Sequence, residues 1–157
     1  MGSWRDLVEA EPAFAERVQA LFDRHPHKTI ATLRRDGSPR ISGIEALIVG
    51  DHLWFGGMPD SRKVRDLLRD ARFALHSGSD DPPGWTGDAK VAGRAEHVTD
   101  PDRIAALVAA TGEGSGPASY FRADLQEVVL TRLGEPADHL LIEAWHEGRG
   151  LQRIARR

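Results

Sequence analysis

The clearest chemical signal in the sequence lies between residues 55 and 63, where a β-type segment ends in two glycines and a helical segment begins with Ser61, Arg62 and Lys63. The first turn of a helix presents free N–H groups and the positive end of the helix dipole, which together suit an anion. Arginine and lysine are usually favoured in the last helical turn, so these two charges oppose the dipole unless an anion binds there. The alternative is a solvent-exposed first turn whose charges bind nothing, and the residues alone leave both interpretations open.

The two glycines, Gly56 and Gly57, follow the apolar run Leu53-Trp54-Phe55. Because glycine has no side chain, we expect the backbone at this point to let a flat ring or a phosphate group come close. If the basic helix start binds an anion, the site is expected between residues 56 and 63.

The composition limits the classes of protein to which the chain can belong. Its 157 residues are the size of one ordinary domain, and we expect a single domain over residues 1–157. The absence of cysteine excludes disulfides, thiolate metal sites and cysteine nucleophiles. The net charge of -3 gives no support for nucleic acid or an anionic membrane as a partner. No apolar run approaches the ~20 residues of a membrane span, so we expect a cytoplasmic protein.

Seven histidines raise the question of a metal site. His25 and His27 flank Pro26, but no third ligand follows at a useful spacing, and we expect no metal. A serine hydrolase is not indicated either, because no Gly-x-Ser-x-Gly elbow occurs. No side chain stands out as an acid or a base, so we assign no catalytic residue.

The elements that would position the anion site are short strands with few helices. Apolar residues at three-to-four spacing predict an N-terminal helix over about 12–25. Asp60 or Ser61 is expected to cap a second helix, and Asp100-Pro101 to open a third. Asp36-Gly37 between two apolar runs predicts a hairpin.

The remaining pattern predicts a mainly β fold. The expected strands cover residues 29–33, 41–49, 53–55, 73–76, 88–98, 125–133, 139–145 and 151–154, and residues 112–117 are expected to form a flexible loop. Tight turns between consecutive strands imply antiparallel pairing, and closure into a barrel is the usual way for such a set to remove its edges.

At this point the sequence resembles a known family, the pyridoxamine 5'-phosphate oxidase-like split β-barrels that bind FMN, which include flavin- and deazaflavin-dependent oxidoreductases. The resemblance runs from Thr29 to Arg153 and rests on the order of several motifs. These motifs are the Asp-Gly-Ser-Pro hairpin at 36–39, Ser61-Arg62-Lys63, the strand Val91-Ala92-Gly93-Arg94-Ala95-Glu96, and the ending Trp145…Gly148…Arg153.

The resemblance implies an antiparallel split β-barrel that works as a homodimer, with FMN bound at the dimer interface and the flavin phosphate held by Arg62 and Lys63 beside Ser61. It implies further cofactor contacts at Arg40, Ser42, Gly43, Gly56, Gly57, Asp88, Trp145 and Arg153. Trp145 and Arg153 would serve the cofactor of the partner subunit.

The sequence departs from the true oxidases at the positions that hold their substrate. Ala46 stands where the oxidase has a lysine, and Gly150-Leu151-Gln152 replaces its Arg-Leu-His segment. We therefore expect flavin binding and hydride transfer to or from an unknown small substrate, without efficient oxidation of pyridoxamine phosphate.

Two alternatives stay open from the sequence. The first is a deazaflavin-dependent reductase, in which Arg34, Arg35 and Arg40 would bind the longer acidic tail of that cofactor. The second is a flavin carrier or sensor that catalyses no reaction.

Overall fold

The computed structural model describes residues 2–112 and 116–157, and within them four helices and eight strands form. The helices are α1 (Trp4–Ala10), α2 (Pro12–Arg24), α3 (Arg62–Arg69) and α4 (Pro101–Thr111). The strands are β1 (His27–Leu33), β2 (Pro39–Val49), β3 (His52–Gly57), β4 (Arg72–His76), β5 (Asp88–Val98), β6 (Ser119–Leu133), β7 (Leu140–His146) and β8 (Gly150–Arg156).

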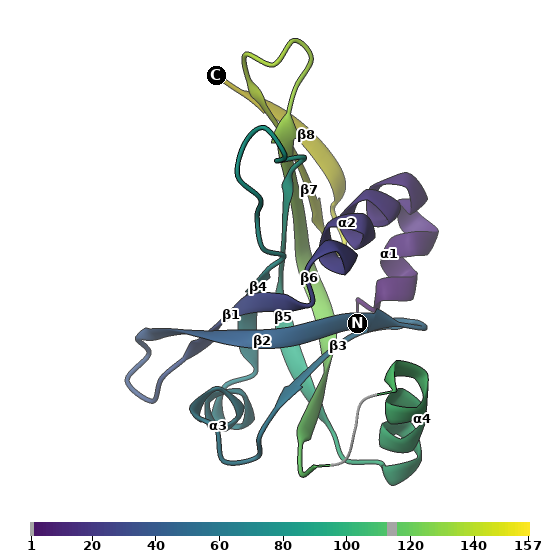
Figure 1. The fold of residues 1–157 in the computed structure, drawn as a ribbon, viewed down its shortest axis with the longest axis vertical. Helices are drawn as coiled ribbons and strands as arrows, with labels where there is room; N and C mark the ends of the chain where they lie inside the picture. The colour runs from purple at the N-terminus through teal and green to yellow at the C-terminus, as the bar shows by residue number, and fades with distance from the viewer. Residues whose placement is uncertain (1, 113–115) are drawn as a thin grey trace.

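The strands of this described part join one antiparallel sheet in the order β3-β2-β1-β4-β5-β6-β7-β8. An additional pairing of β3 with the first residues of β6 closes the first six strands into a barrel. The second half of β6 runs out of the barrel and pairs with β7, which in turn pairs with β8, so these strands project to one end of the molecule (Figure 1). The predicted mainly β, antiparallel split barrel is confirmed.

The barrel is filled by the inward-facing residues of its strands. Ile30, Leu53, Phe55, Leu75 and Phe121 are at most 3% exposed and belong to one continuous core. The amphipathic helix α2 adds Phe14, Val18 and Phe22 to this core, and α3 adds Val64 and Leu67. Burial of these large apolar side chains is the main force that fixes each helix to the barrel.

The predicted elements correspond to observed ones, with two additions. The helix expected over about 12–25 is Pro12–Arg24, and Asp100 caps α4 by accepting from the N–H of Asp102. Helix α1 was not predicted, although Ser3 forms a capping box with Asp6 at its start. Strand β6 begins at Ser119, six residues before the strand expected over 125–133. Of the loop expected over 112–117, residues 113–115 lie outside the described residues.

The projecting end is tied to α2 by a buried carboxylate. Glu143 on β7 is fully buried, and its oxygens accept from Arg17 Nη2 at 2.7 Å, Arg153 Nε at 3.0 Å and Arg132 Nε at 3.2 Å. These arginines come from α2, β8 and β6. One side chain therefore connects four elements.

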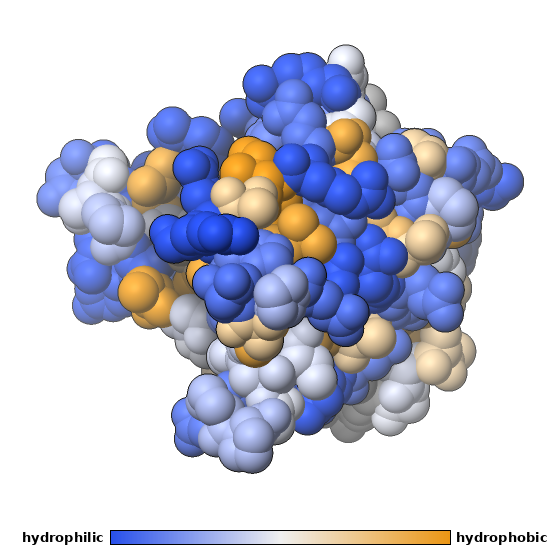
Figure 2. Space-filling model, turned by 90° about the horizontal axis from the view of Figure 1, so that it is seen from above, coloured by the Kyte–Doolittle hydropathy of each residue, from blue (hydrophilic) through white to orange (hydrophobic). Residues whose placement is uncertain are grey.

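Seen from the end at which β7 and β8 project, the surface is mostly hydrophilic, with hydrophobic atoms in several small areas (Figure 2). Leu133, Leu140 and Ile154, on the three strands of this end, are 46%, 38% and 39% exposed. Within the described ranges, none of the helices combines the length and the apolar character that a membrane crossing requires.

We expect Glu143→Gln to lower the free energy of unfolding by about 2–3 kcal/mol, because it removes the negative charge that binds three arginines. The three arginines are partly exposed, so the loss is smaller than for a fully buried ion pair. Urea denaturation measures this difference. Glu127→Gln serves as the control, because the Glu127 side chain is 43% exposed where it contacts His146. This variant should change the free energy of unfolding by less than about 1 kcal/mol. Equal losses in the two variants would contradict the role given to Glu143.

Candidate functional site

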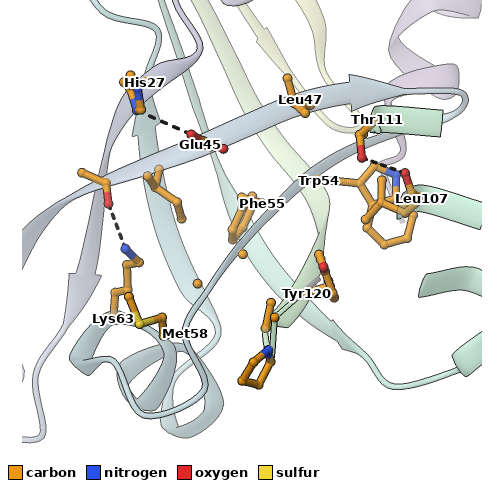
Figure 3. Close-up of a pocket in the computed structure, with 17 residues that line it drawn as sticks. His27, Glu45, Leu47, Trp54, Phe55, Met58, Lys63, Leu107, Thr111 and Tyr120 are labelled. Carbon is orange, nitrogen blue, oxygen red and sulfur yellow. Dashed lines mark hydrogen bonds and ion pairs between the residues drawn. The ribbon is translucent and has the colours of Figure 1, made fainter. Parts of the chain in front are cut away.

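A cleft lies on the outer face of the barrel, over β2 and β3, and encloses about 490 Å³ (Figure 3). Its floor is the backbone of β2 and β3, and its sides come from α3, α4 and the start of β6. A volume of this size is within the range of small-molecule sites. The cleft is therefore large enough to hold a small ligand.

Alternate residues of β2 face this cleft because side chains alternate between the faces of a strand. Gly43, Glu45 and Leu47 line the cleft one after another, and each marks one region along its floor. Lys63 of α3 lies over the Gly43 part, where its Nζ donates to the Gly43 carbonyl at 3.0 Å. Glu45 faces His27 Nδ1 at 3.9 Å, and Leu47 lies at the end that α4 covers (Figure 3).

The N-terminus of α3 offers several unused donors beside Lys63. Ser61 is the N-cap residue, as predicted, but its side chain makes no capping hydrogen bond. The Ser61 hydroxyl oxygen is buried and has no partner among the described residues. The N–H groups of residues 62–64 have no acceptor within the helix, since Arg65 N is the first to reach back to Ser61 O. A buried hydroxyl, free amides and an ammonium group together fit an anion.

Contacts within the protein explain why β3 ends in two residues without side chains. A Cβ on Gly57 would lie 2.8 Å from Lys63 Cε and 3.4 Å from Ser61 Oγ, and one on Gly56 would lie 2.6 Å from the Ser119 carbonyl oxygen. The missing side chain of Gly56 thus makes room for strand β6, and that of Gly57 makes room for the side chain of Lys63. Gly56 and Gly57 nevertheless line the cleft through their backbone.

Helix α3 is held in place by the buried carboxylate of Asp66, which is 2% exposed. Arg40 Nε and Thr32 Oγ1 both donate to one of its oxygens at 2.7 Å, and Arg69 Nη2 donates to the other at 2.9 Å. Burial alone would raise the pKa of Asp66, but the hydrogen bonds from Arg40, Thr32 and Arg69 outweigh it and hold the pKa below its ordinary value.

Four of the residues predicted to bind the cofactor line the cleft: Gly43, Gly56, Gly57 and Lys63. Ser61 lies at its edge, 3.4 Å from the position of a Gly57 Cβ. Arg62 is exposed and does not line the cleft.

Arg40 and Ser42 do not reach the cleft. They alternate with Gly43 along β2, and the guanidinium of Arg40 is bound to Asp66 inside the structure. Arg40 therefore fixes α3 from below through its Nε, and its expected contact with the cofactor stays a prediction.

Asp88, Trp145 and Arg153 lie away from the cleft of their own chain. Asp88 is the first residue of β5, whereas Val98, the last residue of that strand, pairs with Tyr120 of the cleft. The Asp88 carboxylate accepts a hydrogen bond from Trp85 Nε1 at 2.9 Å. Trp145 is a core residue with 6% exposure, and Arg153 is bound to Glu143. Burial of Trp145 leaves it no free face for a cofactor in this chain.

Sequence reasoning missed the rest of the lining. His27 and Glu45 are opposite one another in the β1–β2 ladder, and Gly56 is opposite Tyr120 in the β3–β6 ladder. The hairpin register could have placed the first pair together. The second pair needed the closure of the barrel, which no local pattern indicates.

Comparisons with known proteins bear on the fold and its family. The model of the Pyridoxamine 5'-phosphate oxidase family (PNPOx_N) matches residues 14–132. None of the curated proteins matches the sequence.

Similar solved structures show the same fold at low sequence identity. PhzG from Burkholderia lata, solved with tetrahydrophenazine-1-carboxylic acid, has a TM-score of 0.65 and 14% identity over 94% of this chain and 93% of that one. A protein of unknown function from Agrobacterium tumefaciens has a TM-score of 0.62 and 19% identity over 75% of this chain, which spans only 56% of that protein. An F420 reductase has a TM-score of 0.54 and 19% identity over 70% of this chain and 94% of its own.

We expect Asp66→Asn to lower the free energy of unfolding at pH 7 by about 2–3 kcal/mol, because two arginines and a threonine lose a charged acceptor. The pKa of Asp66 is depressed in the folded state, so its contribution is complete above the unfolded value of 3.8 and is lost as the pH falls through the lower folded value. Urea denaturation at pH 7, 4 and 3 should show the gap between the two proteins narrowing. A gap that stays constant, or an equal loss in the control Asp60→Asn at a 98% exposed side chain, would argue against the network.

Proposed function

The chain belongs to the pyridoxamine 5'-phosphate oxidase family, and from that premise we propose that it binds FMN, with the phosphate at the N-terminus of α3, and acts as a flavin-dependent oxidoreductase. The observation that carries this proposal is the buried, unpaired hydroxyl of Ser61 beside Lys63 and the free amides of the helix start. An unpaired buried hydroxyl is costly unless a ligand completes its hydrogen bonds.

The residues of the cleft fit the parts of this cofactor. Ser61, Lys63 and the amides of residues 62–64 would hold the phosphate, with Arg62 adding charge from the surface. Lys63 has three donors, so it can keep its bond to the Gly43 carbonyl and still donate to a phosphate oxygen. The backbone of Gly56 and Gly57 provides a wall without side chains for the rest of the ligand. A bound flavin would supply hydride or two-electron transfer.

The burial of Ala46 supports the expectation that the protein does not oxidise pyridoxamine phosphate efficiently. Ala46, at the position where the oxidase has its substrate-binding lysine, is 1% exposed and faces the core. No side chain at this position could reach the cleft without a change in the strand. We therefore propose that the substrate is not pyridoxamine phosphate.

We also propose that the chain works as a homodimer with the cleft at its interface. Ile41 and Met58, which are 73% and 76% exposed, flank the Lys63 end of the cleft, and such large apolar side chains favour a protein contact. Arg153, whose side chain is 60% exposed, remains able to approach a partner's cofactor. Trp145 is not proposed for that role, because it is buried in its own core.

A deazaflavin is the second candidate cofactor, supported by the similarity to an F420 reductase. Of the arginines expected to bind its acidic tail, Arg40 is bound to Asp66, which leaves the exposed Arg34 and Arg35 of the β1–β2 hairpin. The absorption spectra of the two cofactors differ, and the spectrum of the purified protein would distinguish them. Bound flavin that no electron donor reduces would instead support a carrier.

We expect Lys63→Ala and Ser61→Ala each to weaken FMN binding by about 10- to 100-fold, as removal of a charge-assisted hydrogen bond of roughly 1.5–3 kcal/mol implies. Riboflavin, which lacks the phosphate, should lose less than about threefold. Fluorescence titration measures both ligands. Arg65→Ala, which removes a 66% exposed cation on the same helix, is the matched control and should leave both affinities nearly unchanged. The phosphate role is wrong if both ligands lose affinity equally.

We expect the protein to have twice the mass of its 17.3 kDa chain in solution, and Ile41→Asp or Met58→Asp to shift it to the monomer, because each places a charge in an apolar contact. Light scattering measures the mass. Leu68→Asp, at a 54% exposed apolar residue that does not line the cleft, is the control and should remain dimeric. A wild-type monomer at all concentrations would contradict the proposed interface.

A further inference from the structure

The cleft continues past the proposed phosphate site into a region of different chemistry. From Gly43 to Leu47, the outward-facing residues of β2 span about 13 Å, since a strand rises roughly 3.3 Å per residue. Lys63 is at the Gly43 end, and Glu45 is the next outward residue. The charge along the floor therefore changes sign from cationic to anionic.

The end beyond Glu45 is an apolar slot. Trp54 and Leu107 form its walls, with Leu47 on the floor (Figure 3). The hydroxyl of Thr111 faces the same slot and donates to the Leu107 carbonyl at 3.0 Å. An aromatic wall and aliphatic side chains of this kind suit a planar ring.

Among the described residues, no cation that lines this end of the cleft pairs with Glu45. Lys28 interacts with the charge of Glu45, but it is buried and lies outside the lining. The one cationic side chain of the described lining, apart from His27, is Lys63, which the phosphate would occupy. Arg122 is opposite Trp54 in the β3–β6 ladder, but it does not line the cleft and its Nη2 is bound to Glu96 at 2.6 Å. His27 is 3.9 Å from Glu45 and 79% exposed, so it makes at most a weak ion pair.

From this juxtaposition of Glu45 with an apolar slot, we propose that the second half of the cleft binds a planar aromatic cation, such as an N-alkylated heteroaromatic ring. The carboxylate would attract the positive charge while Trp54 and Leu107 pack against the ring. A carboxylate or phosphate on such a ring would be disfavoured, because it would meet Glu45 where no cation of the lining is free to pair with it. This inference names the substrate class of the proposed oxidoreductase and rests on that function for its biological meaning.

Isothermal titration of the full-length protein, loaded with FMN, tests the proposal with two probes of one ring system at pH 8. We expect the cation 1-methylquinolinium to bind about three- to tenfold more tightly than the anion quinoline-3-carboxylate, since an exposed carboxylate gives a modest preference. Glu45→Gln should abolish this preference, and Glu45→Lys should reverse it. Glu16→Gln, the same change at an exposed residue of α2 outside the cleft, should leave it intact.

A second variant separates the slot from the charge. Leu107→Ala should weaken both probes by a similar factor and leave their ratio unchanged, because it removes packing and no charge. Failure of both probes to bind, or an unchanged preference in Glu45→Gln, overturns the proposal even if FMN binding is intact. The absorbance of the same samples reports FMN binding separately. A protein that binds no FMN but keeps the Glu45-dependent preference would support the cation subsite and overturn the flavin function.

Discussion

The buried carboxylate of Asp66 is the interaction on which the candidate site depends. It accepts hydrogen bonds from β1, from β2 and from the last turn of its own helix, and so fixes α3 against the barrel. Because the helix is fixed at this point, its N-terminus can present Ser61 and Lys63 at the edge of the cleft. A buried carboxylate is tolerable only with full hydrogen bonding, so the same contacts that position the helix also stabilise the charge.

Closure of the barrel supplies the second constraint. Strand β3 must approach β6 so closely that Gly56 has no room for a Cβ, and Lys63 must cross Gly57 to reach the Gly43 carbonyl. The cleft therefore has a floor of bare backbone for reasons internal to the fold. A planar ligand could use that floor, but packing against β6 alone is sufficient to require Gly56.

Local patterns in the sequence predicted the elements well and the site only in part. The Asp36-Gly37 hairpin, the helix after Ser61 and the cap at Asp100 each depend on neighbouring residues, and each is present. The side chain of Arg40 binds Asp66, which is 26 residues away in the sequence. Gly56 contacts β6, a strand that begins 63 residues further along the chain. Such long-range partners determine whether a cation faces a ligand or the protein, and no spacing in the sequence reveals them.

The central claim is that the N-terminus of α3 holds the phosphate of a flavin. A crystal structure of the protein grown with FMN tests it most directly. We expect phosphate oxygens within hydrogen-bond distance of Ser61 Oγ and Lys63 Nζ, with the ring lying against the backbone of Gly56 and Gly57. A phosphate bound elsewhere, with the Ser61 hydroxyl still unpaired and Lys63 still turned only to Gly43, would contradict it.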